Sequence, residues 1–151
     1  MAPISTTVEI DRTPEVVFAY ATDPTRFSEW QSGVVGGHME GTGPIVVGQI
    51  CMTTRKIGFA ERPITSKVTH FEAPRTWGVR GVDGPIRATV GVTVEPLADR
   101  NRARLTIDVD FEGHGIGKLI VPLAVRRQAR NEMPANLQTL KQNLENGTTG
   151  V

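Results

Sequence analysis

The chain has 151 residues, the usual size of a single compact domain with one hydrophobic core. Its 17 basic and 16 acidic residues leave a formal net charge of +1, so the overall charge gives no reason to expect a nucleic-acid partner. Cys51 is the only cysteine, which excludes an intramolecular disulfide and a thiolate metal cluster, and fits a reducing compartment.

The first thirty residues predict a strand followed by two short helices. Residues 4–11 are rich in Ile, Thr and Val and end at a polar pair, as strands do. Thr13 is a good helix N-cap and Pro14 suits the first helical position, and Asp23 with Pro24 repeats this pattern. In the first helix, the side chains expected to point inward are Val17, Phe18 and Ala21.

The middle of the chain predicts an antiparallel sheet. Two segments, 86–95 and 103–112, alternate apolar and polar residues strictly, which indicates one covered and one wet face. Parallel strands are usually buried on both faces, so this pattern favours antiparallel pairing. Other strands, separated by turns with glycine or proline, are expected at about 33–40, 48–57, 61–72 and 76–81.

The last part of the chain predicts one long amphipathic helix that ends near residue 145 and covers the sheet. Pro134 should kink it. A strongly bent sheet cannot pack tightly against one straight helix everywhere, so we expect an internal cavity. We also expect one domain over 1–146 and a disordered tail over 147–151. The apolar stripe of the helix is Met133, Leu137, Leu140 and Leu144, with Leu119, Arg126 and Ala129 near the same face.

Four segments carry a family resemblance. They are VEIDRTPEVVFAYATDPTRFSEW at 8–30, VGQICMTTRKIG at 47–58, VTHFEAPRTWGVR at 68–80 and GKLIVPLAVRRQARNEMPANLQTLKQNLE at 117–145. Together with the order of the elements, they resemble the START-like superfamily, also called the Bet v 1-like or SRPBCC group. Within it, the chain is most similar to the small bacterial polyketide cyclase/dehydrase-like proteins.

The resemblance implies an α+β helix-grip fold. Its features are a seven-stranded curved antiparallel sheet wrapped around a long C-terminal helix, and two short helices between strands 1 and 2. It also implies a cavity that takes small or lipid-like apolar molecules, which members of the family bind, carry, or in some cases cyclise and dehydrate. By the same resemblance, Trp30 should lie at the start of the second strand near the cavity.

We expect a chiefly aliphatic cavity lining, because the chain has only five Phe, two Trp and one Tyr. Trp77 would stack on a flat ligand, although a strand tryptophan more often fills the core. Apolar contacts of this kind favour shape over specific recognition. The expected lining residues are Trp30, Trp77, Val90, Val92, Leu105, Ile107, Val109, Met133, Leu137 and Leu140.

Two polar residues are candidates for chemistry in the cavity. His38 has an intrinsic pKa near neutrality and would act as an acid or base, although a surface or hydrogen-bonded strand histidine is more common. Arg126 lies on the apolar stripe and would hold a ligand carboxylate or enolate through two N–H bonds. The alternative that we favour is that Arg126 extends to solvent, as we expect of Arg127 and Arg130.

The sequence predicts no metal site and no cofactor. No two histidines have the i, i+4 spacing that places ligands on one helical face. The segment GHGIGK at 113–118 departs from both common phosphate-binding patterns, because Lys118 stands where GxGxxG has glycine and Leu119 stands where the P-loop has Ser or Thr. We expect this segment to be a flexible joint beside the cavity entrance.

Three functions remain open. The first is binding, and by extension transport or sequestration, of a small hydrophobic or polyketide-like molecule in the cavity. The second is a polyketide cyclase or dehydratase that uses one or two polar cavity residues, and the third is a protein-interaction or co-chaperone module. We expect a monomer or homodimer. Because no signal peptide and no membrane span are present in the sequence, we expect a cytoplasmic protein without integral membrane association.

Overall fold

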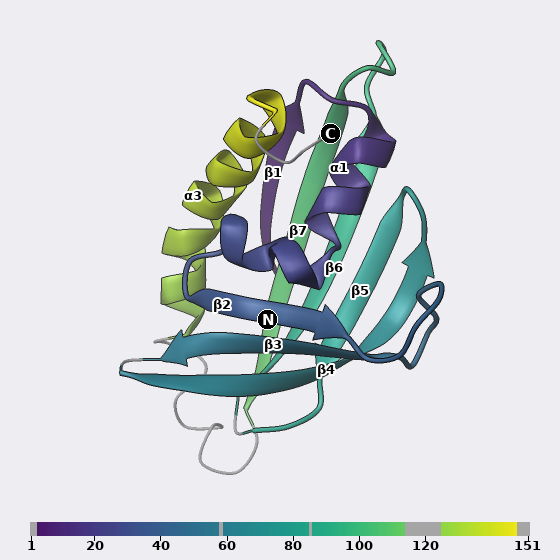
Figure 1. The fold of residues 1–151 in the computed structure, drawn as a ribbon. Helices are drawn as coiled ribbons and strands as arrows, with labels where there is room; N and C mark the ends of the chain where they lie inside the picture. Colours follow the sequence, from purple (N-terminus) through teal and green to yellow (C-terminus); the bar gives the residue numbers. More distant parts are fainter. Residues whose placement is uncertain (1–2, 58, 85, 114–124, 148–151) are drawn as a thin grey trace.

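The computed structural model describes residues 3–57, 59–84, 86–113 and 125–147, and Figure 1 shows the arrangement of their helices and strands. In chain order, the elements are β1 (Ile4–Ile10), α1 (Pro14–Ala21), the 3₁₀ helix η1 (Pro24–Glu29), β2 (Val34–Met39), β3 (Ile50–Ile57), β4 (Ala60–Glu72), β5 (Thr76–Gly81), β6 (Ile86–Pro96), β7 (Ala103–Gly113) and α3 (Arg126–Glu145).

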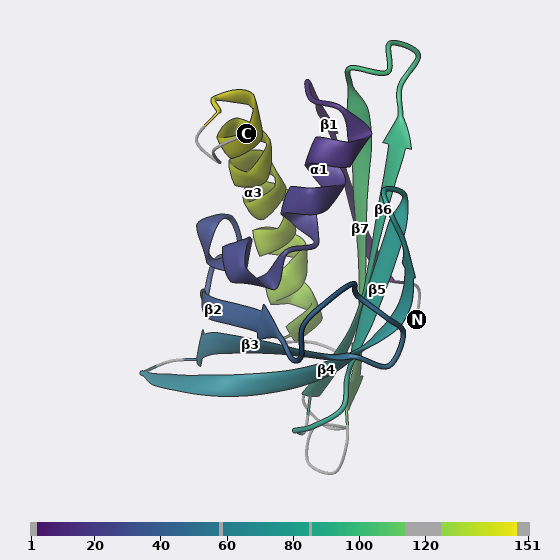
Figure 2. The same ribbon diagram turned by 45° about the vertical axis from the view of Figure 1, so that its right-hand side comes forward.

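The seven strands form one antiparallel sheet in the order β1-β7-β6-β5-β4-β3-β2. Figure 2 shows that the sheet bends, so that β2, β3 and β4 run across the end of β5, β6 and β7. Helices α1 and α3 and the 3₁₀ helix η1 all lie on the inside of this bend, which we call the concave face. The predicted helix-grip fold is therefore confirmed.

The two short helices begin where the cap residues predict. The Thr13 hydroxyl accepts a hydrogen bond from the Val16 amide at 3.4 Å, and the Asp23 carboxylate accepts one from the Thr25 amide at 3.0 Å. Trp30 corrects a detail of the prediction. It forms the C-cap of η1 and does not start the second strand, which begins four residues later at Val34.

The long helix α3 lies against the sheet through its predicted stripe, and Met133, Leu137, Leu140 and Leu144 are all buried. Its main neighbour among the described strands is β1. The helix runs through Pro134 without a break, and Pro134 lies on its exposed side. The kink predicted there stays a prediction.

Polar bonds hold the two sides of α3 in place. On one side, the Ser32 amide donates to Asn136 Oδ1 at 3.1 Å, which joins the loop after η1 to the helix. On the other side, the Asp11 amide donates to the Glu145 carboxylate at 2.8 Å, and Lys141 Nζ donates to the Glu9 carbonyl at 2.6 Å. These contacts set the position of α3 over the sheet from both edges.

Some predictions concern residues outside the described ranges. These are the flexible joint at 113–118, of which Gly113 alone is described, the inward position of Leu119, and the tail at 147–151, of which Gly147 alone is described.

Candidate functional site

The concave face changes from fully buried to half-buried along β6 and β7. Leu105 exposes 0% of its surface and Ile107 7%, whereas Val109 and Phe111, next on the same face of β7, are half-buried. Strand β6 follows the same trend from Val94 outward. The facing pairs, from the deep end outward, are Val94 with Leu105, Val92 with Ile107, Val90 with Val109, and Ala88 with Phe111.

A row of three half-buried valines crosses the outer part of this face. Val90 pairs with Val79 on one side and with Val109 on the other, so the three side chains are neighbours on three adjacent strands. We call Val79, Val90 and Val109 the valine row. All three pack against the core and still keep accessible surface. Apolar side chains left half-exposed on the inside of a curved sheet are suited to contact a small apolar molecule.

The expected lining residues divide into two groups. Val90 and Val109 belong to the valine row, and Ile107 and Met133 keep a little accessible surface. The other group is packed on all sides, since a side chain that bounds an open space would keep accessible surface. Its members, each 5% exposed or less, are Trp30, Trp77, Val92, Leu105, Leu137 and Leu140.

An aromatic cluster lies beneath η1. The Phe27 ring meets Trp30 edge-on at 5.8 Å between centroids and Trp77 at 6.5 Å. Trp30 is 5% exposed, and its indole Nε1 is buried without a hydrogen-bond partner among the described residues. A buried donor without an acceptor costs roughly 1–3 kcal/mol.

Arg55 of β3 brings a positive charge to the concave face. It alternates with buried Cys51 and pairs directly with buried Val34, so its side chain points to the same side as the core. Its Nη2 donates to Gln31 Oε1 at 3.1 Å. Burial lowers the pKa of the Arg55 guanidinium, and the charge of Glu132 on α3 opposes that shift.

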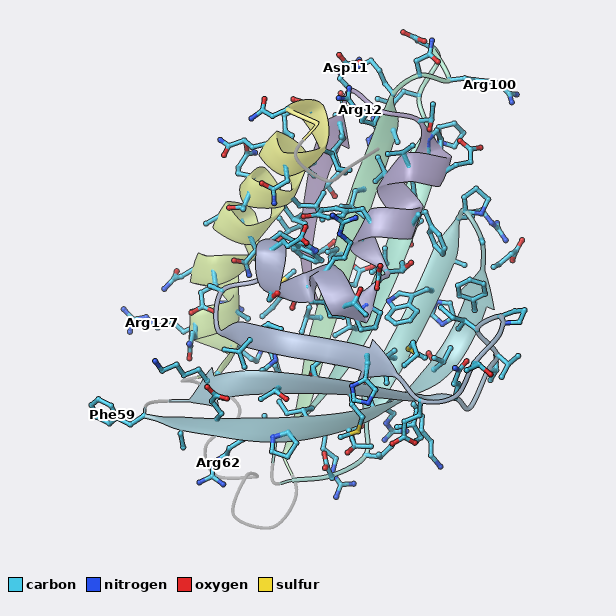
Figure 3. All side chains as sticks on the ribbon, in the orientation of Figure 1. Asp11, Arg12, Phe59, Arg62, Arg100 and Arg127 are labelled. Atoms are coloured by element: carbon cyan, nitrogen blue, oxygen red, sulfur yellow. The ribbon has the colours of Figure 1, made fainter. Side chains whose placement is uncertain are left out.

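Arg126 is buried, so the solvent-directed alternative that the sequence favoured is wrong. Only 6% of its side chain is exposed, and Nη1 donates to the Asp110 carboxylate at 2.8 Å. Arg127 and Arg130 are exposed, as expected, and Figure 3 shows Arg127 pointing away from the sheet. Because Arg126 already has a carboxylate partner, the ion pair gives it a structural role in holding the start of α3 against β7.

His38 lies on the outside of the sheet, the surface position that the sequence analysis gave as the more common one for a strand histidine. It is exposed, and it alternates on β2 with Gly37, whose added Cβ would meet the Pro24 carbonyl oxygen of η1 at 2.8 Å. Gly37 therefore faces η1, and His38 faces away. His70 is also exposed, where its ring nitrogens contact the hydroxyls of Thr69 and Thr76 at 3.1 Å.

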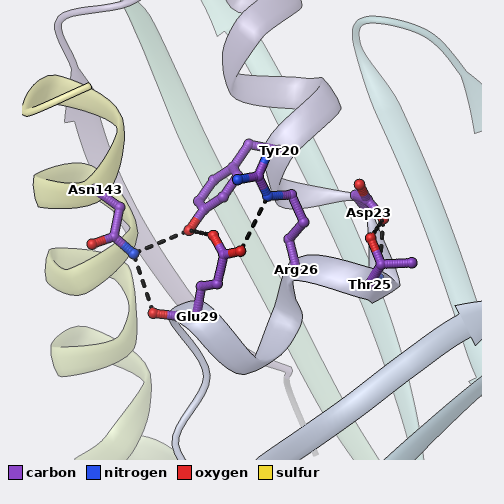
Figure 4. A network of polar contacts seen from close by, with 6 residues as sticks. All are labelled: Tyr20, Asp23, Thr25, Arg26, Glu29 and Asn143. Atoms are coloured by element: carbon purple, nitrogen blue, oxygen red, sulfur yellow. Dashed lines mark hydrogen bonds and ion pairs between the residues drawn. The ribbon is translucent and has the colours of Figure 1, made fainter. Parts of the chain in front are cut away.

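Figure 4 shows the polar junction that joins α1, η1 and α3. The Tyr20 hydroxyl donates to Glu29 Oε1 at 3.0 Å and accepts from Asn143 Nδ2 at 3.0 Å, and the Asn143 amide also donates to the Glu29 carbonyl at 3.1 Å. The Arg26 guanidinium lies 5.3 Å from the centre of the Tyr20 ring and pairs with Glu29. Burial raises the pKa of Tyr20 above its ordinary value. This junction fixes η1 over the concave face.

The described residues contain no group of three or more His, Cys, Asp or Glu placed to hold a metal ion. No helix within the same residues is long and apolar enough to span a bilayer. Large apolar side chains do occur on the outside, and Phe59 at the turn between β3 and β4 extends into solvent (Figure 3). The interaction-module hypothesis depends on such side chains and stays a prediction. The exposed large apolar residues are Val35, Val46, Val47, Phe59 and Val82.

The expected lining did not include Arg55, Val79 and Phe111. Phe111 was visible as the last apolar residue of the alternating strand at 103–112. Arg55 was harder to find, because the two faces of the segment CMTTRK have the same kinds of residue. Each face carries one apolar residue, one threonine and one cation. Only the burial of Cys51 shows which face is inside.

Comparison with known proteins identifies the fold. A family described as polyketide cyclase / dehydrase and lipid transport matches residues 1–145. A search of curated proteins found no match. Solved structures match over nearly the whole chain at low sequence identity, and at that level they show the fold alone.

Three solved structures illustrate the range of these matches. The Zhui aromatase/cyclase from Streptomyces sp. R1128 has a TM-score of 0.69 at 13% identity, covering 94% of each chain. A START superfamily protein from Mycobacterium smegmatis has a TM-score of 0.69 at 15% identity, covering 97% of this chain and 96% of that one. The di-domain ARO/CYC BexL from the BE-7585A biosynthetic pathway has a TM-score of 0.76 at 14% identity, covering 99% of this chain and 48% of that one.

Proposed function

Because the chain belongs to the polyketide cyclase/dehydrase and lipid transport family, we propose that it binds a small apolar or polyketide-like molecule on the concave face of its sheet. The observation that carries this proposal is the valine row, Val79, Val90 and Val109, which stays half-buried on the inside of the bend. Contact with an apolar ligand would remove this surface from water, which contributes about 25 cal/mol per Å².

The test uses 1-N-phenylnaphthylamine, an uncharged dye that fluoresces in apolar surroundings. The wild-type protein should bind the dye at micromolar concentration. The variant Val90→Phe should weaken binding about tenfold or more, because the larger ring occupies the space over the valine row. Val35→Phe serves as the matched control, since Val35 is 46% exposed on β2. Equal binding by both variants, or no binding by the wild type, would rule out this site.

A cyclase or dehydratase is the second candidate, and one observation favours it: Arg55 places an ionisable group on the concave face. A folded poly-ketone is already reactive, so a site that holds chosen carbons close together supplies much of the catalysis. Incubation with a model poly-ketone, followed by chromatography, distinguishes the two. A cyclised product formed faster than in buffer supports the enzyme, and an unchanged poly-ketone supports binding alone.

A further inference from the structure

We propose that the bound molecule is an amphipathic acid, and that the Arg55 guanidinium, held by Gln31, binds its carboxylate or a similar oxyanion. This inference rests on the proposed binding function and names the class of ligand for that site. It follows from the direction of the Arg55 side chain, from its unused donors and from the charges around it.

The direction of Arg55 is set by the register of β3. Arg55 is two residues from Thr53 and four from Cys51, and Cys51 is 2% exposed. Thr53 pairs with Gly37, which faces η1. These alternate positions share one face of the strand, so the guanidinium extends over the concave face towards Gln31, in the loop before β2.

The guanidinium has more donors than partners. Arginine carries five N–H donors in a planar fork, and in the described part of the chain only Gln31 Oε1 accepts a hydrogen bond from it. Gln31 also orients the fork, because its own backbone amide is tied to the Phe27 carbonyl at 2.8 Å. A ligand carboxylate would accept two parallel bonds from the free edge of the fork, the geometry that arginine binds best.

The charges around Arg55 also favour an anion. Glu132 of α3 is close enough to act on the charge of Arg55, but within residues 3–57, 59–84, 86–113 and 125–147 it forms no ion pair with Arg55. A half-buried cation with no direct counter-ion gains from a ligand that brings one. The guanidinium donates and does not accept, which suits ligand oxygens.

The distances explain why the rest of the ligand should be apolar. A strand rises about 3.3 Å per residue, so the Arg55 backbone lies about 13 Å along β3 from Cys51. Cys51 lies next to Ser66 of β4, and the neighbouring Val68 pairs with Val79 of the valine row. A molecule that reaches from the guanidinium to the valine row is therefore long, charged at one end and apolar at the other.

A pair of competitors with the same chain tests the inference. Dodecanoate and dodecan-1-ol differ only in the end group, and each is titrated against the bound 1-N-phenylnaphthylamine. In the wild type, dodecanoate should displace the dye at a concentration about tenfold lower than dodecan-1-ol. Arg55→Met keeps the length of the side chain without its charge, so this preference should disappear while dodecan-1-ol competes as before.

Arg62→Met is the matched control, because Arg62 pairs directly with Arg55 across β3 and β4 but is exposed. This variant should change the concentration at which dodecanoate displaces the dye by less than about threefold. Arg55→Lys keeps the charge and loses the fork, so it should keep only part of the preference. Equal displacement by the acid and the alcohol in the wild type, or a preference that survives in Arg55→Met, would overturn the inference. Loss of dye binding by the wild type would instead overturn the proposed function.

If circular dichroism shows that Arg55→Met does not fold, the comparison of dodecanoate with dodecan-1-ol in the wild type still tests the inference. Raising NaCl from 50 to 500 mM should reduce the advantage of dodecanoate over dodecan-1-ol, since salt screens a partly exposed charge pair. A wild type that shows no advantage at either salt concentration contradicts the inference.

Discussion

At the scale of single residues, the surroundings of a side chain decide the chemistry that it can perform. The Cys51 thiol is buried beside β2 and β4, and this burial raises its pKa to about 11. The thiolate, which is the nucleophilic form, is therefore scarce at neutral pH. Arg55, on the same face of the same strand, is half-buried and keeps a hydrogen-bonding partner.

The raised pKa of Cys51 predicts a loss of stability in alkali. The ordinary pKa is 9.0, so between pH 9 and about 11 the unfolded chain loses the thiol proton while the folded chain keeps it. This contribution to stability is intact below pH 9 and declines as the pH rises. At pH 10.5 the wild type should have lost about 2 kcal/mol through this group.

Urea denaturation at pH 8 and pH 10.5 measures this loss. Tyr20 also titrates in alkali, so the comparison is with Cys51→Ala, which keeps this tyrosine. Cys51→Ala should lose about 2 kcal/mol less than the wild type over the same interval. Identical losses in the two proteins would show that the folded state does not hold the thiol protonated.

At the scale of elements, the position of η1 depends on the junction of Tyr20, Glu29 and Asn143. Tyr20→Phe removes one hydroxyl, and with it one hydrogen bond to the Glu29 carboxylate and one from the Asn143 amide. The free energy of unfolding should fall by about 1–2 kcal/mol. Ser28→Ala, at an exposed position of η1, should change it by less than about 0.5 kcal/mol. Chemical denaturation followed by circular dichroism measures both variants, and equal stabilities would contradict this role of the junction.

The elements themselves were largely predictable from the sequence, because their signals are local. Thr13 and Asp23 mark the helix starts, and strict alternation marks β6 and β7. The facing of side chains on the other strands, and of Arg126 on α3, was not predictable. Arg126 shows the reason: its burial depends on Asp110, sixteen residues away on another element, and helical periodicity alone did not decide between burial and solvent.

The same limit applies to the candidate site. The sequence predicted an apolar lining and placed Val90 and Val109 in it. It did not separate them from Leu105 and Leu140, which are also apolar and were also expected to face inward, but expose no surface. That separation depends on how far each strand extends beyond the helices that cover it. The bend of the whole sheet sets how much of each strand stays uncovered.

At the scale of the whole molecule, the bend of the sheet creates the difference between the two ends of the concave face. Where α1 and α3 cover the sheet, the side chains form a close-packed core, and farther along β6 and β7 the same face keeps accessible apolar surface (Figures 1 and 2). The proposed function depends on this difference. A ligand that binds there should affect the outer part of the face and leave the outside of the sheet unchanged.

Methyl NMR of the valines during titration with dodecan-1-ol is the most direct measurement. We predict that the methyl signals of Val79, Val90 and Val109 shift with saturation, while those of the exposed Val35, Val46 and Val47 stay in place. The alcohol is uncharged, so the result does not depend on Arg55. Shifts confined to Val35, Val46 and Val47, or no shifts at ligand concentrations up to its solubility, would contradict binding on the concave face.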